Sequence, residues 1–321
     1  MSLLPDDPLV QVPAPQPTDP PVEGRPSSPV RVGTAAPGCP AEQSSADAGG
    51  HGDSGFSPAT NDGQPAQILP AAPANPTSSD PAWNGWDVLR LTFLTIVALV
   101  FFVPAVALIA RLWLHPHMGL GEILRFPLVA IAGQALAYLL VLAYMYVLVA
   151  RERRRPDFLT AIHWNWPHNI AGYVLGGFVL SLALQAVAHL LPIPKDLPID
   201  SFFRTPAEAW VLGILSVTLA PLMEELFFRG FLYPVLARSL GLPVAVFLTA
   251  LGFALLHGAQ LGFAWGPVLV IFLVGLVLTM VRAKRNSVAA SLLIHMAYNG
   301  TITVAMFAAT DGFRHLEKLN N

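Results

Sequence analysis

Two adjacent carboxylates, Glu224 and Glu225, stand with Arg229 inside the otherwise apolar stretch 219–240. A charged side chain near the centre of a bilayer costs roughly 2.5–3.5 kcal/mol on insertion scales, and such residues usually face the protein interior and serve a function. On a helix, Glu225 and Arg229 share a face and can form an ion pair, whereas Glu224 lies about 100° further round. The spacing therefore predicts one paired and one free carboxylate.

Pro221 lies three residues before Glu224. A proline inside a helix cannot donate a hydrogen bond to the carbonyl four residues earlier, here that of Val217, and it bends the helix axis. Polar backbone at membrane depth is tolerated where it is buried in protein or lines a cavity. Pro221 thus predicts a bend that leaves polar backbone beside the carboxylates.

Two further motifs follow at helical spacing. FALLH places Phe253 and His257 one turn apart, and HMAYN does the same for His295 and Asn299. At about 1.5 Å per residue from the helix ends nearest the basic loops, Glu224, His257 and Asn299 lie about 18–21 Å deep and His295 about 12 Å. Alone, each histidine is more often a packing residue and the asparagine interhelical glue. Their similar depth favours one shared site.

A buried carboxylate beside histidines is equipped to take a proton from water, and histidine or asparagine N–H groups can stabilise an oxyanion. These parts suffice for peptide hydrolysis without a covalent intermediate, and the motifs place no serine or cysteine as a nucleophile. Glu224, His257 and His295 are also a plausible set of zinc ligands, although they lack HExxH spacing. We favour the mechanism without a cofactor, with a divalent metal such as zinc as the alternative.

Composition indicates which elements position these residues. The 321 residues are 54% hydrophobic and 12% charged, with a mean hydropathy of +0.56, which is typical of a polytopic membrane protein. We expect an all-α transmembrane bundle of about seven to eight helices. The seven apolar stretches that predict it are 91–110, 126–150, 170–192, 208–238, 243–257, 264–281 and 287–309.

The chain divides by composition into four parts. Residues 1–82 hold seventeen of the thirty prolines with much Ala, Ser, Gly and Asp, which predicts a disordered tail. N-terminal transmembrane helices are expected over 83–204, catalytic helices over 205–310 and a polar C-terminal tail over 311–321. Cys39 is the only cysteine, so no disulfide or cysteine metal site is expected.

Charge indicates location and partners. The tail, the RERRR sequence at 151–155, Arg238 and the RAKR sequence at 282–285 fall on one face if the chain crosses seven times. The positive-inside rule makes that face cytoplasmic, so we expect a multi-pass protein of the cell membrane with a cytoplasmic N-terminal tail. Neither half is basic enough to indicate nucleic acid. The lipid bilayer and a membrane-tethered peptide or protein are the expected partners.

The APLMEELFFRG, FALLH and HMAYN blocks, in that order on successive helices, resemble the CPBP family. This family contains the CAAX prenyl endopeptidases and the bacteriocin-processing or self-immunity proteins. Its motifs are a double glutamate followed by arginine, Phe-xxx-His, and His-xxx-Asn/Asp. The resemblance covers about residues 205–305 and is specific as a triplet, although each motif alone is weak.

The resemblance implies roles for individual residues. Glu224 matches the catalytic glutamate, and His257 matches the histidine that helps to activate water. His295 and Asn299 match the pair on the oxyanion side. The supporting residues are Glu225, Arg229 and Phe253. The family fold is a bundle of about eight helices around a cavity open to the cytosol, one helix more than the seven predicted here.

The leading hypothesis is an intramembrane endopeptidase that hydrolyses a membrane-associated substrate, possibly of the prenylated CAAX type, with a water activated by Glu224. A proton-coupled transporter is one alternative, in which Glu224 and the histidines would form a relay, although no inverted repeat is evident. A non-catalytic immunity or scaffold protein is the other, and it predicts that Glu224→Ala leaves function intact.

Overall fold

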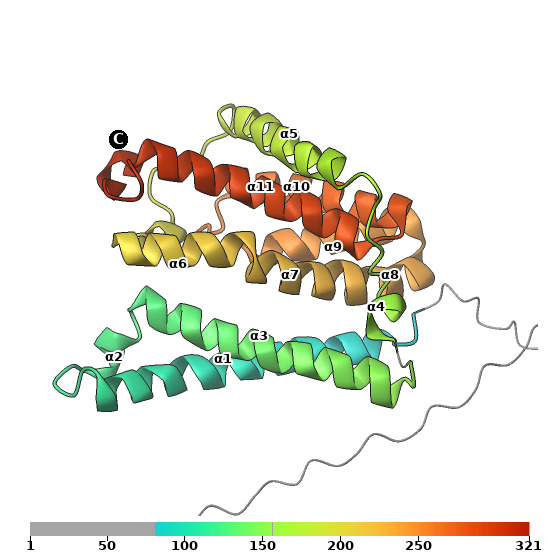
Figure 1. The fold of residues 1–321 in the computed structure, drawn as a ribbon, viewed down its shortest axis with the longest axis horizontal. Coiled ribbons are helices and arrows are strands. Elements are labelled where there is room, and N and C mark those ends of the chain that lie inside the picture. Colours follow the sequence, from blue (N-terminus) through green and yellow to red (C-terminus); the bar gives the residue numbers. More distant parts are fainter. Residues whose placement is uncertain (1–80, 156, 321) are drawn as a thin grey trace, which may run out of the picture. The chain divides into compact units, whose positions relative to one another are not determined.

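A computed structural model describes residues 81–155 and 157–320. The predicted tail 1–82 therefore lies almost entirely outside the described residues. Within the described ranges the chain is helical and contains no strand (Figure 1), which confirms the all-α class. Among the described residues, six helices are long and apolar enough to span a membrane, and α9 is a shorter apolar helix. The seven predicted spans correspond to these six and α9. No eighth span follows α11 in the described part of the chain.

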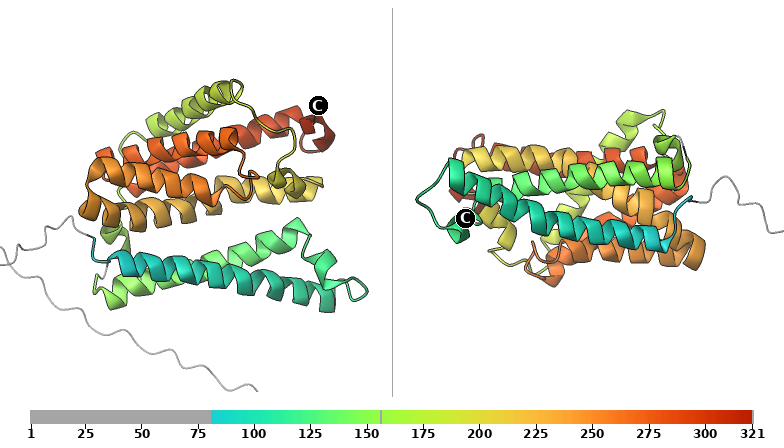
Figure 2. Two further views of the ribbon diagram at one scale, coloured as in Figure 1. Left: turned by 180° about the vertical axis from the view of Figure 1, so that it is seen from behind. Right: turned by 90° about the horizontal axis from the view of Figure 1, so that it is seen from below.

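The N-terminal helices form an antiparallel pair. α1 (Gly85–Trp113) is followed by the short α2 (Leu120–Ile123) and by α3 (Pro127–Val147), which continues as a π-helix over Leu148–Glu152. The views in Figures 1 and 2 show α1 and α3 side by side along their lengths. A capping box opens α1, because the Asn84 side chain accepts from the Asp87 N–H and Asp87 accepts from the Asn84 N–H.

The remaining helices form a second group. α4 (Phe158–Ala161) leads to α5 (Ile170–Ala188), and a 3₁₀ turn (Pro198–Phe202) leads to α6 (Pro206–Val217) and α7 (Leu219–Glu225). A π-helix (Leu226–Leu232) joins α7 to α8 (Tyr233–Leu240). α9 (Leu242–Leu256), α10 (Trp265–Arg285) and α11 (Val288–Ala309) follow, and a 3₁₀ turn (Leu316–Asn320) ends the described chain. α5 lies along α11 (Figure 1).

The segment predicted as one helix over 208–238 is interrupted twice. The first interruption is at Thr218, whose φ of −116° and ψ of −83° are not helical. Pro221, three residues later, has no N–H to give to the Val217 carbonyl, which accounts for a break at this turn. The second is the π-helix that begins directly after Glu225. π-helical turns are rare and frequently occur at functional sites.

Small residues bring the helices of the second group into close contact. A Cβ atom added to Gly177 of α5 would lie 2.4 Å from the Ile294 carbonyl oxygen on α11, and one added to Gly275 of α10 would lie 3.1 Å from the Ala250 Cα on α9. Glycine at such crossings lets backbones approach where side chains would hold them apart. These contacts hold α5 close to α11 and α9 close to α10.

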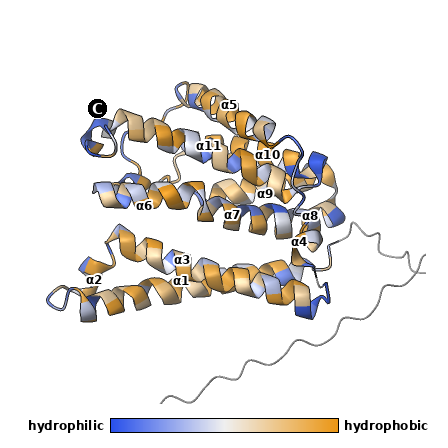
Figure 3. Cartoon of the chain, viewed as in Figure 1, coloured by the Kyte–Doolittle hydropathy of each residue, from blue (hydrophilic) through white to orange (hydrophobic). Residues whose placement is uncertain are grey.

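The outer surface of the bundle is apolar. Large hydrophobic side chains such as Phe93, Val100, Phe178 and Phe247 are exposed, and hydrophilic residues gather towards the helix ends (Figure 3). A contiguous exposed apolar surface of this kind fits contact with lipid rather than water. The composition-based expectation of a multi-pass membrane protein agrees with this surface.

One end of the bundle is held together by the first described residues. The Trp83 Nε1–H donates to the Phe231 carbonyl at 3.0 Å, and the two rings stack with centroids 4.5 Å apart. The Arg238 guanidinium donates to the carbonyls of Pro81 and Trp83. Asp87 of α1 pairs with Arg153 beyond α3. The start of α1 is therefore bonded to the π-helix Leu226–Leu232 and to α8.

Candidate active site

The Glu225–Arg229 ion pair is the most deeply buried part of the site. Both side chains are 0% exposed, and the Arg229 Nη1 donates to the Glu225 Oε1 at 2.9 Å. The other two guanidinium nitrogens donate to residues of α10. Nη2 lies 3.1 Å from the Gly275 carbonyl oxygen, and Nε lies 3.3 Å from the Thr279 Oγ1. A buried ion pair persists only with good geometry and further hydrogen bonds, and the Arg229 guanidinium has both. The predicted pairing is confirmed.

Glu224 is the more accessible of the two carboxylates. Its side chain is 16% exposed, and it lies between two imidazoles: its Oε1 is 3.7 Å from the His257 Nε2, and its Oε2 is 3.6 Å from the His295 Nε2. These separations exceed a normal hydrogen bond, and polar contacts of this length are commonly bridged by water. Helices α7, α9 and α11 thus bring Glu224, His257 and His295 together in one shared site.

Hydrogen bonds at Nδ1 orient both imidazoles. The His257 Nδ1 lies 2.8 Å from the Phe253 carbonyl oxygen, which is only an acceptor, so this nitrogen carries the proton. The His295 Nδ1 lies 2.9 Å from the Glu225 Oε1 and donates to that carboxylate. Each ring therefore presents its Nε2 to Glu224. In the neutral ring that Nε2 is an acceptor, ready to receive a proton from a water.

Phe253 packs in the centre of this group. Its ring is 1% exposed and contacts both imidazoles, with centroids 4.8 Å from His257 and 5.7 Å from His295. The Arg229 guanidinium carbon lies 4.6 Å from the Phe253 ring centroid, in a cation–π arrangement. One aromatic ring thus separates the buried ion pair from water and holds both histidines in place. The predicted supporting residues Glu225, Arg229 and Phe253 all contact the site.

The end of α9 exposes His257 to the site. α9 ends at Leu256, and His257 is its C-cap residue with φ −82° and ψ −8°. The turn that follows is tied to the 3₁₀ segment, because the Ile199 N–H donates to the Gln260 carbonyl at 3.0 Å. At 15 residues α9 is about 22 Å long. The short α9 therefore ends within the bundle and places an imidazole at its tip.

Asn299 is not brought into direct contact with Glu224. Its Nδ2 donates to the Ser216 carbonyl at 2.8 Å, two residues before the break at Thr218. An asparagine amide has two N–H donors, so this bond uses one and leaves the other. The family resemblance implies that Asn299 lies on the oxyanion side, and the structure gives it a bond that joins α11 to the interrupted helix.

Tyr138 and Gln134 on α3 were not identified from the sequence. Tyr138 interacts electrostatically with Glu224, and its hydroxyl accepts from the Gln134 Nε2 at 2.7 Å. Both lie in an apolar stretch, four residues apart, and this polar pair at helical spacing was the available signal. Thr279 and the Gly275 carbonyl, which hold Arg229, carry no signal of their own because any helix offers such groups.

The donor chemistry of Glu224, His257 and His295 suits zinc, but their arrangement does not. Among the described residues, no group of three or more His, Cys, Asp or Glu side chains is placed to hold a metal ion. We derive no step through a metal.

Comparison with known proteins covers the segment that carries this site. Residues 206–301 match the family described as type II CAAX prenyl endopeptidase Rce1-like. The chain is also 31% identical over 138 residues to the UPF0177 protein YbdI of Lactococcus lactis subsp. lactis (strain IL1403), a match that covers 42% of this chain and 71% of the relative. No solved structure matches the chain significantly. Both similarities point the same way as the three motifs, and the chain belongs to the Rce1-like type II CAAX prenyl endopeptidase family, the CPBP family.

Proposed function

We propose that this protein is an intramembrane endopeptidase that hydrolyses a membrane-associated peptide with a water activated by Glu224. Family membership supports a CAAX-type intramembrane protease. The observation that carries the finer proposal is the position of Glu224, a partly exposed carboxylate whose two oxygens lie 3.7 and 3.6 Å from two imidazole Nε2 atoms. A carboxylate held at membrane depth between two imidazoles supports a role for Glu224 in proton transfer.

In the proposed reaction, a water bound between Glu224 and His257 gives one proton to the Glu224 carboxylate while its oxygen attacks the scissile carbonyl carbon. The carbonyl electron pair moves to oxygen and forms a tetrahedral oxyanion. His295, oriented by Glu225, faces the same space and in its protonated form donates to that oxyanion, together with the second N–H of Asn299. The C–N bond then breaks, and the proton passes from Glu224 to the departing amine.

The test uses the purified full-length protein in lipid nanodiscs with three reporter peptides that share one CAAX sequence: farnesylated, geranylgeranylated and unmodified. We expect wild-type protein to cleave at least one prenylated reporter, and Glu224→Gln to lose that cleavage by roughly 10³-fold, within the range for general acid–base groups. A chelator added to the same assay should leave the rate unchanged. No cleavage of any reporter by wild type, or an equal rate for Glu224→Gln, would contradict the proposal, and inhibition by the chelator would replace the metal-free mechanism.

We also propose that the end of the bundle carrying the start of α1 faces the cytoplasm of a cell membrane. Supporting contacts gather the basic segments at this end, including the Asp87–Arg153 pair and the bonds from Arg238 to residues 81 and 83. Such an excess of Lys and Arg marks the cytoplasmic side. Labelling of Cys39, the single cysteine, tests this orientation. A membrane-impermeant maleimide should label Cys39 in lysed cells but not in intact cells. Labelling in intact cells would reverse the orientation.

A further inference from the structure

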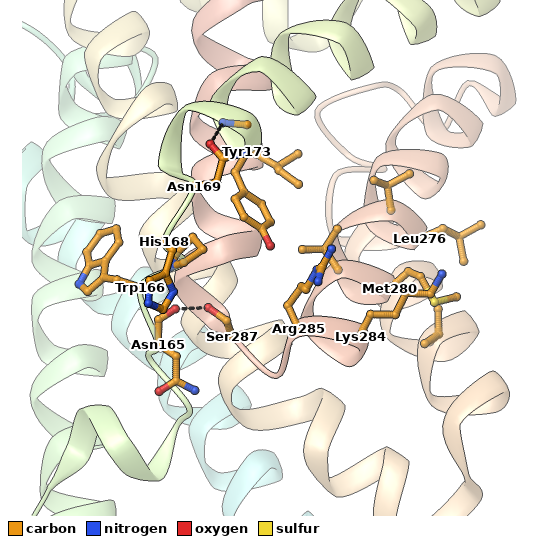
Figure 4. Close-up of a pocket in the computed structure, with 16 residues that line it drawn as sticks. Asn165, Trp166, His168, Asn169, Tyr173, Leu276, Met280, Lys284, Arg285 and Ser287 are labelled. Atoms are coloured by element: carbon orange, nitrogen blue, oxygen red, sulfur yellow. Dashed lines mark hydrogen bonds between the residues drawn. The ribbon is translucent and has the colours of Figure 1, made fainter.

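A second site lies away from Glu224, between the start of α5 and the last turns of α10. It is a pocket of about 1,100 Å³, larger than most drug-sized ligand pockets. Its apolar wall comes chiefly from α10, with Leu276, Val277 and Met280, and Ile294 of α11 completes it. Val277 and Met280 are exposed. Figure 4 shows Tyr173 of α5 and Arg285 of α10 projecting into the space between these helices.

The rim of this pocket is basic. The RAKR sequence at the end of α10 contains three basic residues, of which one is buried and two are exposed. Arg282 is buried and donates to the Arg229 carbonyl at 3.1 Å and to the Asn286 Oδ1 at 2.7 Å. Lys284 and Arg285 are exposed and line the pocket, and in the described part of the chain neither forms an ion pair. Two cations are therefore available at the mouth of an apolar pocket.

The polar wall of the pocket is preformed. The Ser287 hydroxyl donates to the Asn165 carbonyl, and the Asn165 Nδ2 donates to the Asn286 carbonyl at 2.9 Å. Asn169 caps α5 by accepting from the Gly172 N–H at 2.9 Å. The loop before α5 is thus fixed to the turn between α10 and α11. A ligand would meet a shaped pocket rather than order a loose one.

We propose that this pocket binds one anionic phospholipid, with an acyl chain along Leu276, Val277 and Met280 and the phosphate between Lys284 and Arg285. Charge complementarity selects the occupant. Apolar surface on a membrane-spanning helix is covered by acyl chains, and basic pockets between such helices at the membrane surface recognise anionic headgroups. A neutral phospholipid would match the wall but not the rim. None of Glu224, His257 and His295 lines the pocket, so this proposal does not rest on the peptidase.

The experiment is native mass spectrometry of the full-length protein, released from detergent with phosphatidylglycerol or phosphatidylcholine at equal concentration. Three proteins are compared: wild type, Lys284→Gln/Arg285→Gln, and the matched control Arg151→Gln/Arg154→Gln. The control removes two exposed arginines from the basic segment that follows α3 and does not line the pocket.

We expect wild type and the control to retain one phosphatidylglycerol about tenfold more strongly than phosphatidylcholine, and the Lys284/Arg285 variant to lose that preference, in line with the attraction of juxtamembrane basic residues to anionic lipid. An equal loss in the control would show that general surface charge is responsible, and it would overturn the site. So would equal retention of the two lipids by wild type. A third variant, Met280→Trp, should fill the pocket and lower retention of both lipids, and unchanged retention would place the lipid elsewhere.

Discussion

Two ion pairs, one fully buried and one partly buried, serve different purposes in this protein. Glu225–Arg229 lies where α7, α10 and α11 meet, and both side chains are 0% exposed. Asp87–Arg153 lies at the basic end of the bundle, where Asp87 is 0% exposed but Arg153 is 29% exposed. Arg229 is bonded on all sides by α7 and α10, whereas Arg153 retains access to solvent.

The difference lies in what each acidic residue does besides pairing. Asp87 also accepts from the Asn84 N–H at 2.9 Å, so it caps α1. Glu225 also accepts from the His295 Nδ1, so it sets the orientation of an imidazole that faces Glu224. One pair fastens a helix end, and the other carries the orientation of the site. Removing each acid should therefore affect different properties and by different amounts.

The largest loss of stability is expected for Glu225→Ala. It leaves the Arg229 guanidinium buried without its counter-charge, which typically costs about 3–5 kcal/mol. Chemical unfolding in detergent should show a correspondingly lower free energy of unfolding. The double variant Glu225→Ala/Arg229→Met is the control, because removing both charges should recover part of the loss. Equal stability of Glu225→Ala and wild type would contradict the assigned pair.

His257→Ala should act on the rate rather than on stability. His257 is part-exposed at the tip of α9, and its imidazole bonds to the Phe253 carbonyl of its own helix. We expect a reduction in kcat of about 10²-fold, at the lower end for an acid–base group, with an unfolding midpoint close to wild type. His117→Ala, at an exposed position between α1 and α2, is the matched control. If both variants lost activity equally, His257 would have no special role.

Asp87→Ala should cost less than Glu225→Ala, about 1–3 kcal/mol, the usual range for a buried hydrogen-bonding group left without its partner. Arg153 can turn to solvent, which limits the penalty. The same unfolding measurement gives this value, and peptide cleavage per folded molecule should remain that of wild type. A loss as large as that of Glu225→Ala would erase the contrast between the pairs.

The smallest effect concerns pH at the basic end. Burial, with a further contribution from the positive charge of Arg282, lowers the pKa of His163 below its ordinary value of 6.5. The unfolded chain then binds a proton at a higher pH than the folded protein does, so stability falls as pH drops from the unfolded pKa through the folded pKa. His163→Asn should flatten this part of the pH dependence of the unfolding free energy. An unchanged slope would assign it to another group.

Particular residues show how far the sequence reached. The Glu225–Arg229 pair follows from i, i+4 spacing. The convergence of Glu224, His257 and His295 was expected from their roughly similar depth, although His295 was placed several ångströms nearer the basic end. The π-helix after Glu225 does not follow, since π-helical turns are rare and no sequence signal marks this one. The bond from Asn299 to Ser216 depends on where the helix breaks.

The proposed lipid pocket also could not be predicted from the sequence. It depends on how α5 and α10 pack, which neither stretch encodes alone. The sequence identified the basic residues at 282–285 as one cluster, but it could not separate the buried Arg282 from Lys284 and Arg285. That division depends on the Arg229 carbonyl of a distant helix.

The central claim is that Glu224 performs chemistry while its neighbour Glu225 maintains structure. The most direct measurement compares Glu224→Gln with Glu225→Gln, two isosteric changes one residue apart, for both unfolding free energy and cleavage of a prenylated reporter. Glu224→Gln should fold as stably as wild type and cleave roughly 10³-fold more slowly, whereas Glu225→Gln should lose stability. A stable Glu224→Gln protein that cleaves at the wild-type rate would contradict the account.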